Sequence, residues 1–136
     1  MEYLAGAAIA GFISAAASWV GFDRDRAFYP TLLIVIASYC ALFSVLGSTP
    51  QVLAIEVVPI GVCVVLAVLG FKRSAWFVVA GLLAHAVFDV LHPHVIHNDG
   101  VPGWWPGFCL AYDTTAAAYL AAKLLRQQSA HIASAN

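Results

Sequence analysis

The sequence predicts an all-helical integral membrane protein, a bundle of five transmembrane helices. The first observation is composition: the 136 residues are 62% hydrophobic and only 10% charged. The mean hydropathy is +0.88, whereas soluble domains carry roughly 25% charged residues. The second is that the apolar residues form five runs, each near the roughly 20 residues that a helix needs to cross a bilayer. The third is that the lysines and arginines occur only in alternate connections and at the end of the last run.

The five expected spans follow one another with short connections. We expect them at residues 2–22, 27–47, 51–71, 75–92 and 106–126. They form a single domain over residues 1–128, followed by a polar C-terminal tail at 129–136. The first run lacks the basic segment of a secretory signal, so we interpret it as a retained span. Because Pro93 follows His92, we expect the fourth helix to end or bend there.

The basic residues predict an orientation. With five crossings, one side of the membrane holds all six of them: Arg24, Arg26, Lys72, Arg73, Lys123 and Arg126. Basic loops stay on the cytoplasmic side. We therefore expect the N-terminus outside and the C-terminus in the cytoplasm of a multi-pass protein in a cell membrane, taken here as the bacterial inner membrane.

Most of the polar chemistry lies in the stretch from His85 to Asp99, which holds four of the chain's five histidines. His85, Asp89 and His92 are spaced i, i+4 and i+7, so they share one stripe of a helix. Ionisable residues in membrane-spanning segments are costly and usually functional. The spacing therefore predicts a polar site inside the membrane.

Residues from other spans are expected at a similar depth. At about 1.5 Å rise per residue, most of the polar residues lie between roughly 18 and 25 Å from the cytoplasmic end of a core about 30 Å thick. This group comprises Tyr39, Glu56, Asp89, His92, Cys109 and Asp113. His85 is deeper, at about 15 Å. We expect one shared pocket that opens to the outside.

The carboxylates at that depth need a positive charge, and no lysine or arginine is placed to supply it. An imidazolium, protons on the carboxylates or a bound metal ion would each do so. We expect a divalent metal, zinc first and iron as the alternative, because of the ligand types. The expected ligands are His85, Asp89, His92 and Asp113. Glu56 and Asp113 are the expected catalytic bases acting on metal-bound water.

Accessory roles are expected for four further residues, His94, His97, Cys109 and Tyr39. The two histidines beyond Pro93 would belong to a loop that covers the site. The odd number of cysteines predicts no disulfide framework. Cys40 and Cys63 are interpreted as small buried apolar residues.

Three functions are compatible with this site. The first is a metal-dependent enzyme, a hydrolase or oxidoreductase, acting on a lipid or other apolar small molecule. The second is a proton-coupled transporter or small-solute carrier in which Glu56, Asp89 and Asp113 exchange protons. The third is a redox subunit that binds haem or quinone. The net charge of -1 does not indicate the basic surface that nucleic-acid binding requires.

The expected partners are the lipid bilayer and a second copy of the chain. Ala7 and Gly11 form a small-xxx-small pair that lets another helix approach closely. Such helix faces predict close packing, either within the chain or in a homo-oligomer.

The segment from His85 to Lys123 resembles a bacterial family of short multi-pass membrane proteins. Members carry a His-x3-Asp-x2-His helix end, a loop rich in proline and tryptophan, and Cys-x3-Asp at the start of the last span. Those positions here are His85, Asp89, His92, Cys109 and Asp113. The resemblance implies that Cys109 and Asp113 share a site with the histidine helix, and it implies no activity. In site chemistry alone, the chain is also similar to the alkaline ceramidase superfamily of intramembrane zinc hydrolases.

Overall fold

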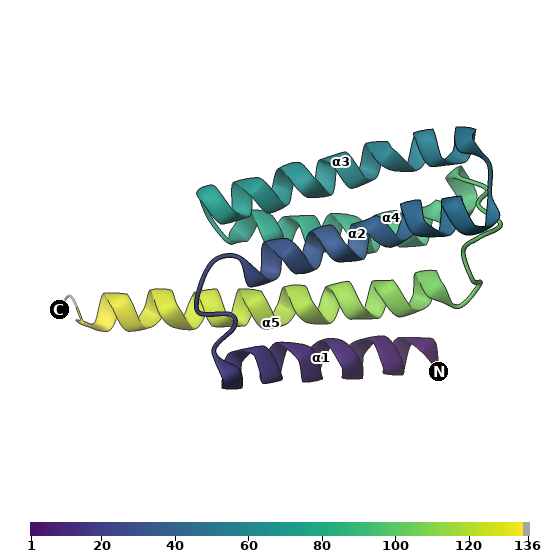
Figure 1. Ribbon diagram of the computed structural model, residues 1–136. Helices are drawn as coiled ribbons and strands as arrows, with labels where there is room; N and C mark the ends of the chain where they lie inside the picture. The colour runs from purple at the N-terminus through teal and green to yellow at the C-terminus, as the bar shows by residue number, and fades with distance from the viewer. Residues whose placement is uncertain (135–136) are drawn as a thin grey trace.

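The computed structural model describes residues 1–134, and within them every regular element is an α-helix (Figure 1). The five helices are α1 (Glu2–Val20), α2 (Phe28–Gly47), α3 (Pro50–Lys72), α4 (Trp76–Val95) and α5 (Trp105–Ser134). The predicted all-helical class is confirmed for these residues. Each of the five expected spans lies on one helix, with beginnings that agree within a residue or two.

Helices α1 to α4 are each long and apolar enough to cross a membrane. Helix α5 is the longest, at 30 residues, but its sequence is less apolar. Its first half includes Tyr112, Asp113, Thr114 and Thr115, which lower its hydropathy. The fifth span and the orientation of the termini therefore stay predictions.

The helices alternate in direction, and α5 lies between α1 and the remaining three (Figure 1). Helices α2, α3 and α4 contact one another, and α4 also packs along α5. Helix α1 packs closely along α5, and only its side chains reach α2, as Ser14 does beside Tyr29. Helix α5 extends beyond the ends of its neighbours (Figure 1). Its apolar half therefore connects α1 to the rest of the bundle.

The contact between α1 and α5 uses small residues. Gly6, Ala10, Ser14 and Ala17 are the buried residues of α1. A Cβ atom added to Gly6 would overlap the carbonyl group of Phe108, so only glycine permits this approach. Gly11 of the expected Ala7/Gly11 pair has open space around it. The face of α1 that packs against α5 therefore contains Gly6 and Ala10 rather than Ala7 and Gly11. Successive residues of a helix are rotated by about 100° around its axis, so a shift of one residue selects a different face.

Two expected ends are corrected by the structure. Helix α4 does not stop at Pro93 but continues to Val95. Proline removes only one hydrogen bond, and the Ile96 N–H still closes the last turn on the His92 carbonyl at 2.8 Å. The tail expected from residue 129 continues α5 to Ser134, and residues 135–136 lie outside the described part.

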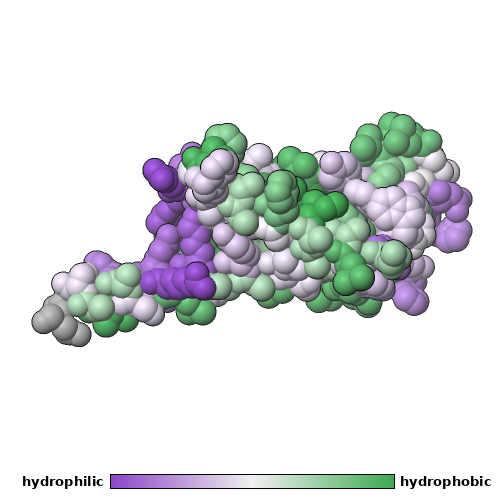
Figure 2. Space-filling model, turned by 90° about the horizontal axis from the view of Figure 1, so that it is seen from below, coloured by the Kyte–Doolittle hydropathy of each residue, from purple (hydrophilic) through white to green (hydrophobic). Residues whose placement is uncertain are grey.

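The two ends of the bundle are hydrophilic and the middle is apolar, as Figure 2 shows from one side. At one end Lys123 forms an ion pair with Asp23, and its ammonium group also donates to the Asp23 carbonyl at 3.2 Å. Ser18 donates to the same carboxylate, and Tyr119 donates to Ser18 at 3.1 Å. These bonds fasten the loop after α1 to α5.

Candidate functional site

The imidazole of His85 joins α4 to α5 inside the bundle. Its Nδ1 lies 2.8 Å from Asp113 Oδ2 and 3.2 Å from Asp89 Oδ2. His85 and Asp89 are each 3% exposed and Asp113 is 0% exposed, so all three are shielded from solvent. Asp89 follows His85 by one helical turn, whereas Asp113 comes from the facing helix. The expected contact of the histidine helix with Asp113 is present in the structure.

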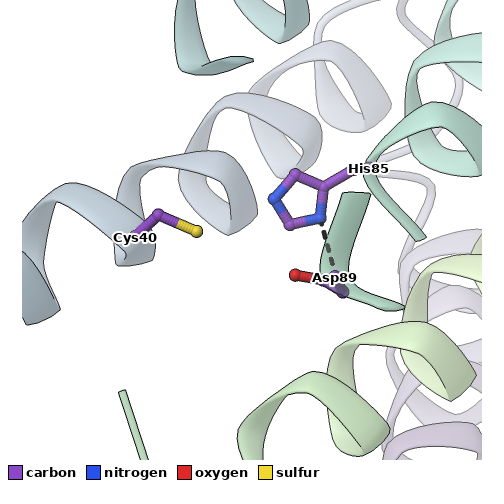
Figure 3. A group of neighbouring side chains, drawn as sticks. All are labelled: Cys40, His85 and Asp89. Atoms are coloured by element: carbon purple, nitrogen blue, oxygen red, sulfur yellow. Dashed lines mark ion pairs between the residues drawn. The ribbon is translucent and has the colours of Figure 1, made fainter. Parts of the chain in front are cut away.

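Cys40 of α2 completes this group from a third helix. Cys40, His85 and Asp89 each offer one potential ligand atom, and the three atoms lie within 4.8 Å of one another. Figure 3 shows Nδ1 of His85 directed at Asp89 and the other ring nitrogen, Nε2, on the side of Cys40. In a tetrahedral zinc site, sulfur and nitrogen ligands are about 3.5 Å apart. Small side-chain movements would therefore let the three residues share one ion.

Several polar atoms in this group lack a hydrogen-bond partner among the described residues. They are His85 Nε2, Asp89 Oδ2 and Asp113 Oδ1, all fully enclosed. Buried polar groups in proteins are almost always hydrogen-bonded, and an unpaired group costs about 1–3 kcal/mol. Among these three atoms, Asp89 Oδ2 keeps only the 3.2 Å ion-pair contact with His85 Nδ1, so a bound cation or water would be needed to satisfy the group.

A second buried centre joins α3 to α4. His92 Nε2 lies 2.6 Å from Glu56 Oε1, and the Asn98 amide donates to the same oxygen at 3.0 Å. Glu56 is 0% exposed and His92 4% exposed. His92 shares a stripe with His85, but seven residues along a helix correspond to about 10 Å. In this structure His92 Nε2 is directed at Glu56, and the close group of potential ligand atoms comprises Cys40, His85 and Asp89 without His92.

The two centres are connected through α2 and the outer loop. The Asn98 amide also donates to the Ser44 hydroxyl at 2.8 Å. The Ser44 hydroxyl in turn donates to the carbonyl of Cys40 at 3.1 Å. A Cβ atom on Gly100 would overlap the Phe43 carbonyl, so the loop lies directly against the end of α2. Residues of four helices and one loop thus form a continuous polar layer.

Three of the expected accessory residues lie outside both centres. His94 is exposed, and His97 is paired with exposed Asp99 at 3.3 Å. Tyr39 is 36% exposed and contacts the ring of Trp105. Cys109 is buried on α5, one turn before Asp113.

Sequence reasoning did not include Cys40, Ser44 and Asn98 in the site. Their spacing offered one signal: Ala37, Cys40 and Ser44 are spaced as one helical face, and all three are buried. Asn98 lies in the loop after α4, and its side-chain amide donates to Ser44 and to Glu56. An asparagine beside a histidine-rich helix end is a suitable partner for a buried carboxylate, because its amide donates without adding charge.

No protein-family model, no curated protein and no solved structure matches the chain. The comparisons therefore place it in no family.

Chemically, the first centre offers a thiol, an imidazole and a carboxylate around one point, with a second carboxylate behind the imidazole. Zinc takes these ligand types, and iron accepts imidazole and carboxylate. The only lysine in contact with a carboxylate in residues 1–134 is Lys123, which is bound to Asp23. The buried carboxylates thus have only histidines, protons or a bound cation for charge compensation.

Proposed function

We propose that the chain is a membrane-embedded metal-binding protein. Cys40 Sγ, His85 Nε2 and a carboxylate oxygen of Asp89 would bind one divalent ion, with zinc first and iron as the alternative. The observation that carries the proposal is the unpartnered, buried Nε2 of His85 beside Cys40 and Asp89. A protonated His85 would also compensate the two aspartates, and its Nε2–H would then have the weak acceptor Sγ of Cys40 beside it.

Asp113 has a supporting role in this proposal. Metal-binding histidines nearly always donate their other ring N–H to a carboxylate, which fixes the tautomer and the ring orientation. His85 Nδ1 lies 2.8 Å from Asp113 Oδ2, which suits that arrangement. Asp113 is therefore proposed as a positioning residue for His85.

The membrane arrangement is part of the proposal. We infer that α5 also crosses the bilayer, with the N-terminus outside and the C-terminus in the cytoplasm of a cell membrane. This inference is supported by the direction of the helices and by the position of the basic residues in the connections after α1 and α3 and in the second half of α5.

Metal-dependent hydrolysis of a lipid or other apolar substrate is the activity we propose for this centre. Three protein ligands leave a coordination position open, as in catalytic zinc sites, where a bound water becomes the nucleophile. Release of fatty acid from bilayer lipids by the zinc-loaded chain, and its absence in a His85→Ala variant, is the expected result.

Metal analysis of the purified chain tests the binding proposal. We expect about one zinc or iron per chain by elemental mass spectrometry, and its loss in His85→Ala and in Cys40→Ala. His94→Ala is the matched control, because His94 lies on the same helix but is exposed. That variant should keep its metal.

Two results would contradict the proposal. One is a wild-type chain that remains free of metal after dialysis against zinc and against ferrous iron. The other is equal metal content in wild type and His85→Ala. Circular dichroism of each variant checks that the helical fold is retained.

A further inference from the structure

A cleft of about 460 Å³ lies at the end of the bundle where α2 and α4 begin and where α5 leaves its neighbours (Figure 1). Its volume is within the range of roughly 300–1,000 Å³ that is typical of ligand pockets. The loop after α1, the loop before α4 and the second half of α5 line it. None of its lining residues belongs to the proposed metal centre.

The charges that line the cleft are mostly positive. Arg24, Arg26, Arg73 and Lys123 line it, together with the acidic residues Asp23 and Asp25. Lys123 is bound to Asp23, and Asp25 accepts a hydrogen bond from the backbone of Ala27 at 3.0 Å. No arginine in residues 1–134 forms an ion pair with a carboxylate. Three guanidinium groups therefore face one cleft without an acidic partner.

Local structure brings these arginines together. The Arg26 guanidinium donates to the backbone carbonyl of Arg73 at 3.5 Å, which links the two loops. Helix α2 begins at Phe28 and α4 at Trp76, and the N-cap residues of both are alanines that cannot cap with a side chain. Ser74 accepts from the Trp76 N–H at 3.4 Å, and the other N–H groups of the first turn of α4 have no side-chain acceptor within residues 1–134. The positive ends of both helix dipoles thus add to the field of the arginines.

The height of the cleft matches the lipid headgroup region. It lies at the level where two apolar helices begin, and hydrophilic residues gather at this end of the molecule in Figure 2. Trp76, which lines the cleft, is 37% exposed. Tryptophan at such a position is typical of a membrane–water interface.

We propose that this cleft binds the phosphate group of an anionic phospholipid. Guanidinium groups bind phosphate through paired N–H donors, and basic pockets between transmembrane helices are suited to anionic headgroups. The acyl chains of the lipid would follow the apolar surfaces of α2 and α4 into the bilayer. The site is independent of any metal in the bundle.

Native mass spectrometry of the detergent-solubilised chain tests this proposal. The chain is titrated separately with dioleoylphosphatidylglycerol, with dioleoylphosphatidylcholine and with inorganic phosphate. We expect the first phosphatidylglycerol to bind about tenfold more tightly than phosphatidylcholine. The double variant Arg26→Gln/Arg73→Gln should lose that preference, because each basic residue near a headgroup contributes roughly a fivefold effect.

Arg126→Gln is the matched control, since Arg126 is basic and at the same end but does not line this cleft. It should keep its preference within about twofold. Arg24→Gln serves as a second cleft variant if the double variant unfolds, which a thermal melt reveals.

Three outcomes would overturn the proposal. Equal affinity for the two lipids would show that there is no anion site. An Arg126→Gln effect as large as that of the cleft variants would show diffuse attraction to the basic surface. Binding of inorganic phosphate as tight as that of phosphatidylglycerol would assign the cleft to a free anion.

Discussion

At the scale of single residues, the two buried centres differ in how well their atoms are paired. Glu56 Oε1 accepts from Asn98 and lies next to His92, so one oxygen has two partners from two segments. Its other oxygen, Oε2, has no hydrogen-bond partner among the described residues. In the His85 centre one atom on each of three residues lacks such a partner, and of these Asp89 Oδ2 keeps only the 3.2 Å ion-pair contact with His85 Nδ1. We infer that the Glu56 centre mainly stabilises the fold and holds the outer loop, and that the His85 centre has a ligand.

Replacing Glu56 should therefore destabilise the chain without removing its metal. Glu56→Ala leaves His92 and Asn98 buried without their acceptor, and breaking a buried pair in this way costs about 3–5 kcal/mol. Glu56→Gln should cost less, because the amide oxygen still accepts from Asn98. Chemical unfolding in detergent micelles measures both.

Asp99→Asn provides the comparison for that experiment. Asp99 and His97 form an ion pair whose side chains are 77% and 92% exposed, and exposed pairs contribute about 0–1 kcal/mol. An unfolding free energy for Glu56→Ala as high as that for Asp99→Asn would exclude a stabilising role for the buried pair.

The sequence predicted part of the site. The spacing of His85 and Asp89 within one helix was sufficient to predict that they are neighbours, because the i, i+4 relation sets their distance. Contacts between helices depend on how each helix is rotated, which one sequence does not determine. For that reason the sequence predicts Cys40 as a packing residue, whereas the structure places it beside His85. The sequence likewise groups His92 with His85, whereas in the structure His92 Nε2 lies against Glu56.

At the scale of helices, the contact between α1 and α5 depends on close approach at Gly6. Association of helices within a membrane relies on packing, because lipid tails are as apolar as the side chains. Gly6→Ala would place a methyl group against the Phe108 carbonyl. We expect it to destabilise the chain by about 1–3 kcal/mol, as overpacking does.

Gly11→Ala makes the same chemical change on the same helix where the structure has open space. It should leave the unfolding free energy within about 0.5 kcal/mol of wild type. Thermal melts of the two variants side by side measure the difference. Equal melting temperatures would show that Gly6 is not a packing position.

The Asp23–Lys123 contact, which joins the loop after α1 to α5, predicts that the stability of the chain depends on pH. Burial would raise the pKa of Asp23, but the hydrogen bonds from Lys123 and Ser18 and the charge of Lys123 outweigh burial and hold the pKa below 3.8. A lowered pKa in the folded state gives stability that is present above the unfolded value and lost as the pH falls. The stabilisation should therefore be complete at pH 7 and decline below about pH 4.

The comparison of wild type with Asp23→Asn isolates this contribution. The difference between their melting temperatures should be largest near pH 7 and shrink as the pH is lowered toward 3. Asp25→Asn, in the same loop but exposed, should show little difference at either pH. A constant difference for Asp23→Asn across the range would contradict the assignment.

Helix positions were predictable because each span is a long apolar run, whereas helix ends were less so. Pro93 lies in the last turn of α4, where the loss of one hydrogen bond does not end the helix. Residues 127–134 are polar but rich in helix-forming alanine and glutamine, so α5 continues past its apolar part. Hydropathy predicts which residues can be in lipid, and helix propensity decides where the helix ends.

At the scale of the whole molecule, the proposed orientation places the loop between α4 and α5 outside and the C-terminal turns of α5 inside. Cysteine labelling tests both the orientation and the fifth crossing. His97→Cys should react with a membrane-impermeant maleimide on intact cells, and Ala130→Cys only after lysis. The three native cysteines are buried, so they should add little background.

The labelling pattern distinguishes the proposed topology from a chain whose α5 does not cross the bilayer and from the opposite orientation. Reaction of both introduced cysteines on intact cells would mean that α5 does not cross the bilayer. Reaction of Ala130→Cys alone on intact cells would mean the opposite orientation. The unmodified chain serves as the blank.

The close packing of α1 along a single helix also affects how the protein is made. Among the five described helices α1 leaves the ribosome before the others, but α5, along which it packs closely, is made last. Helices α2, α3 and α4 contact one another and are consecutive, so they can assemble while synthesis continues. If α5 crosses the bilayer as proposed, α1 lacks its main packing partner until α5 is inserted. Chains released before α5 is complete would thus expose the small-residue face of α1, and membrane quality control would have a specific feature by which to detect them.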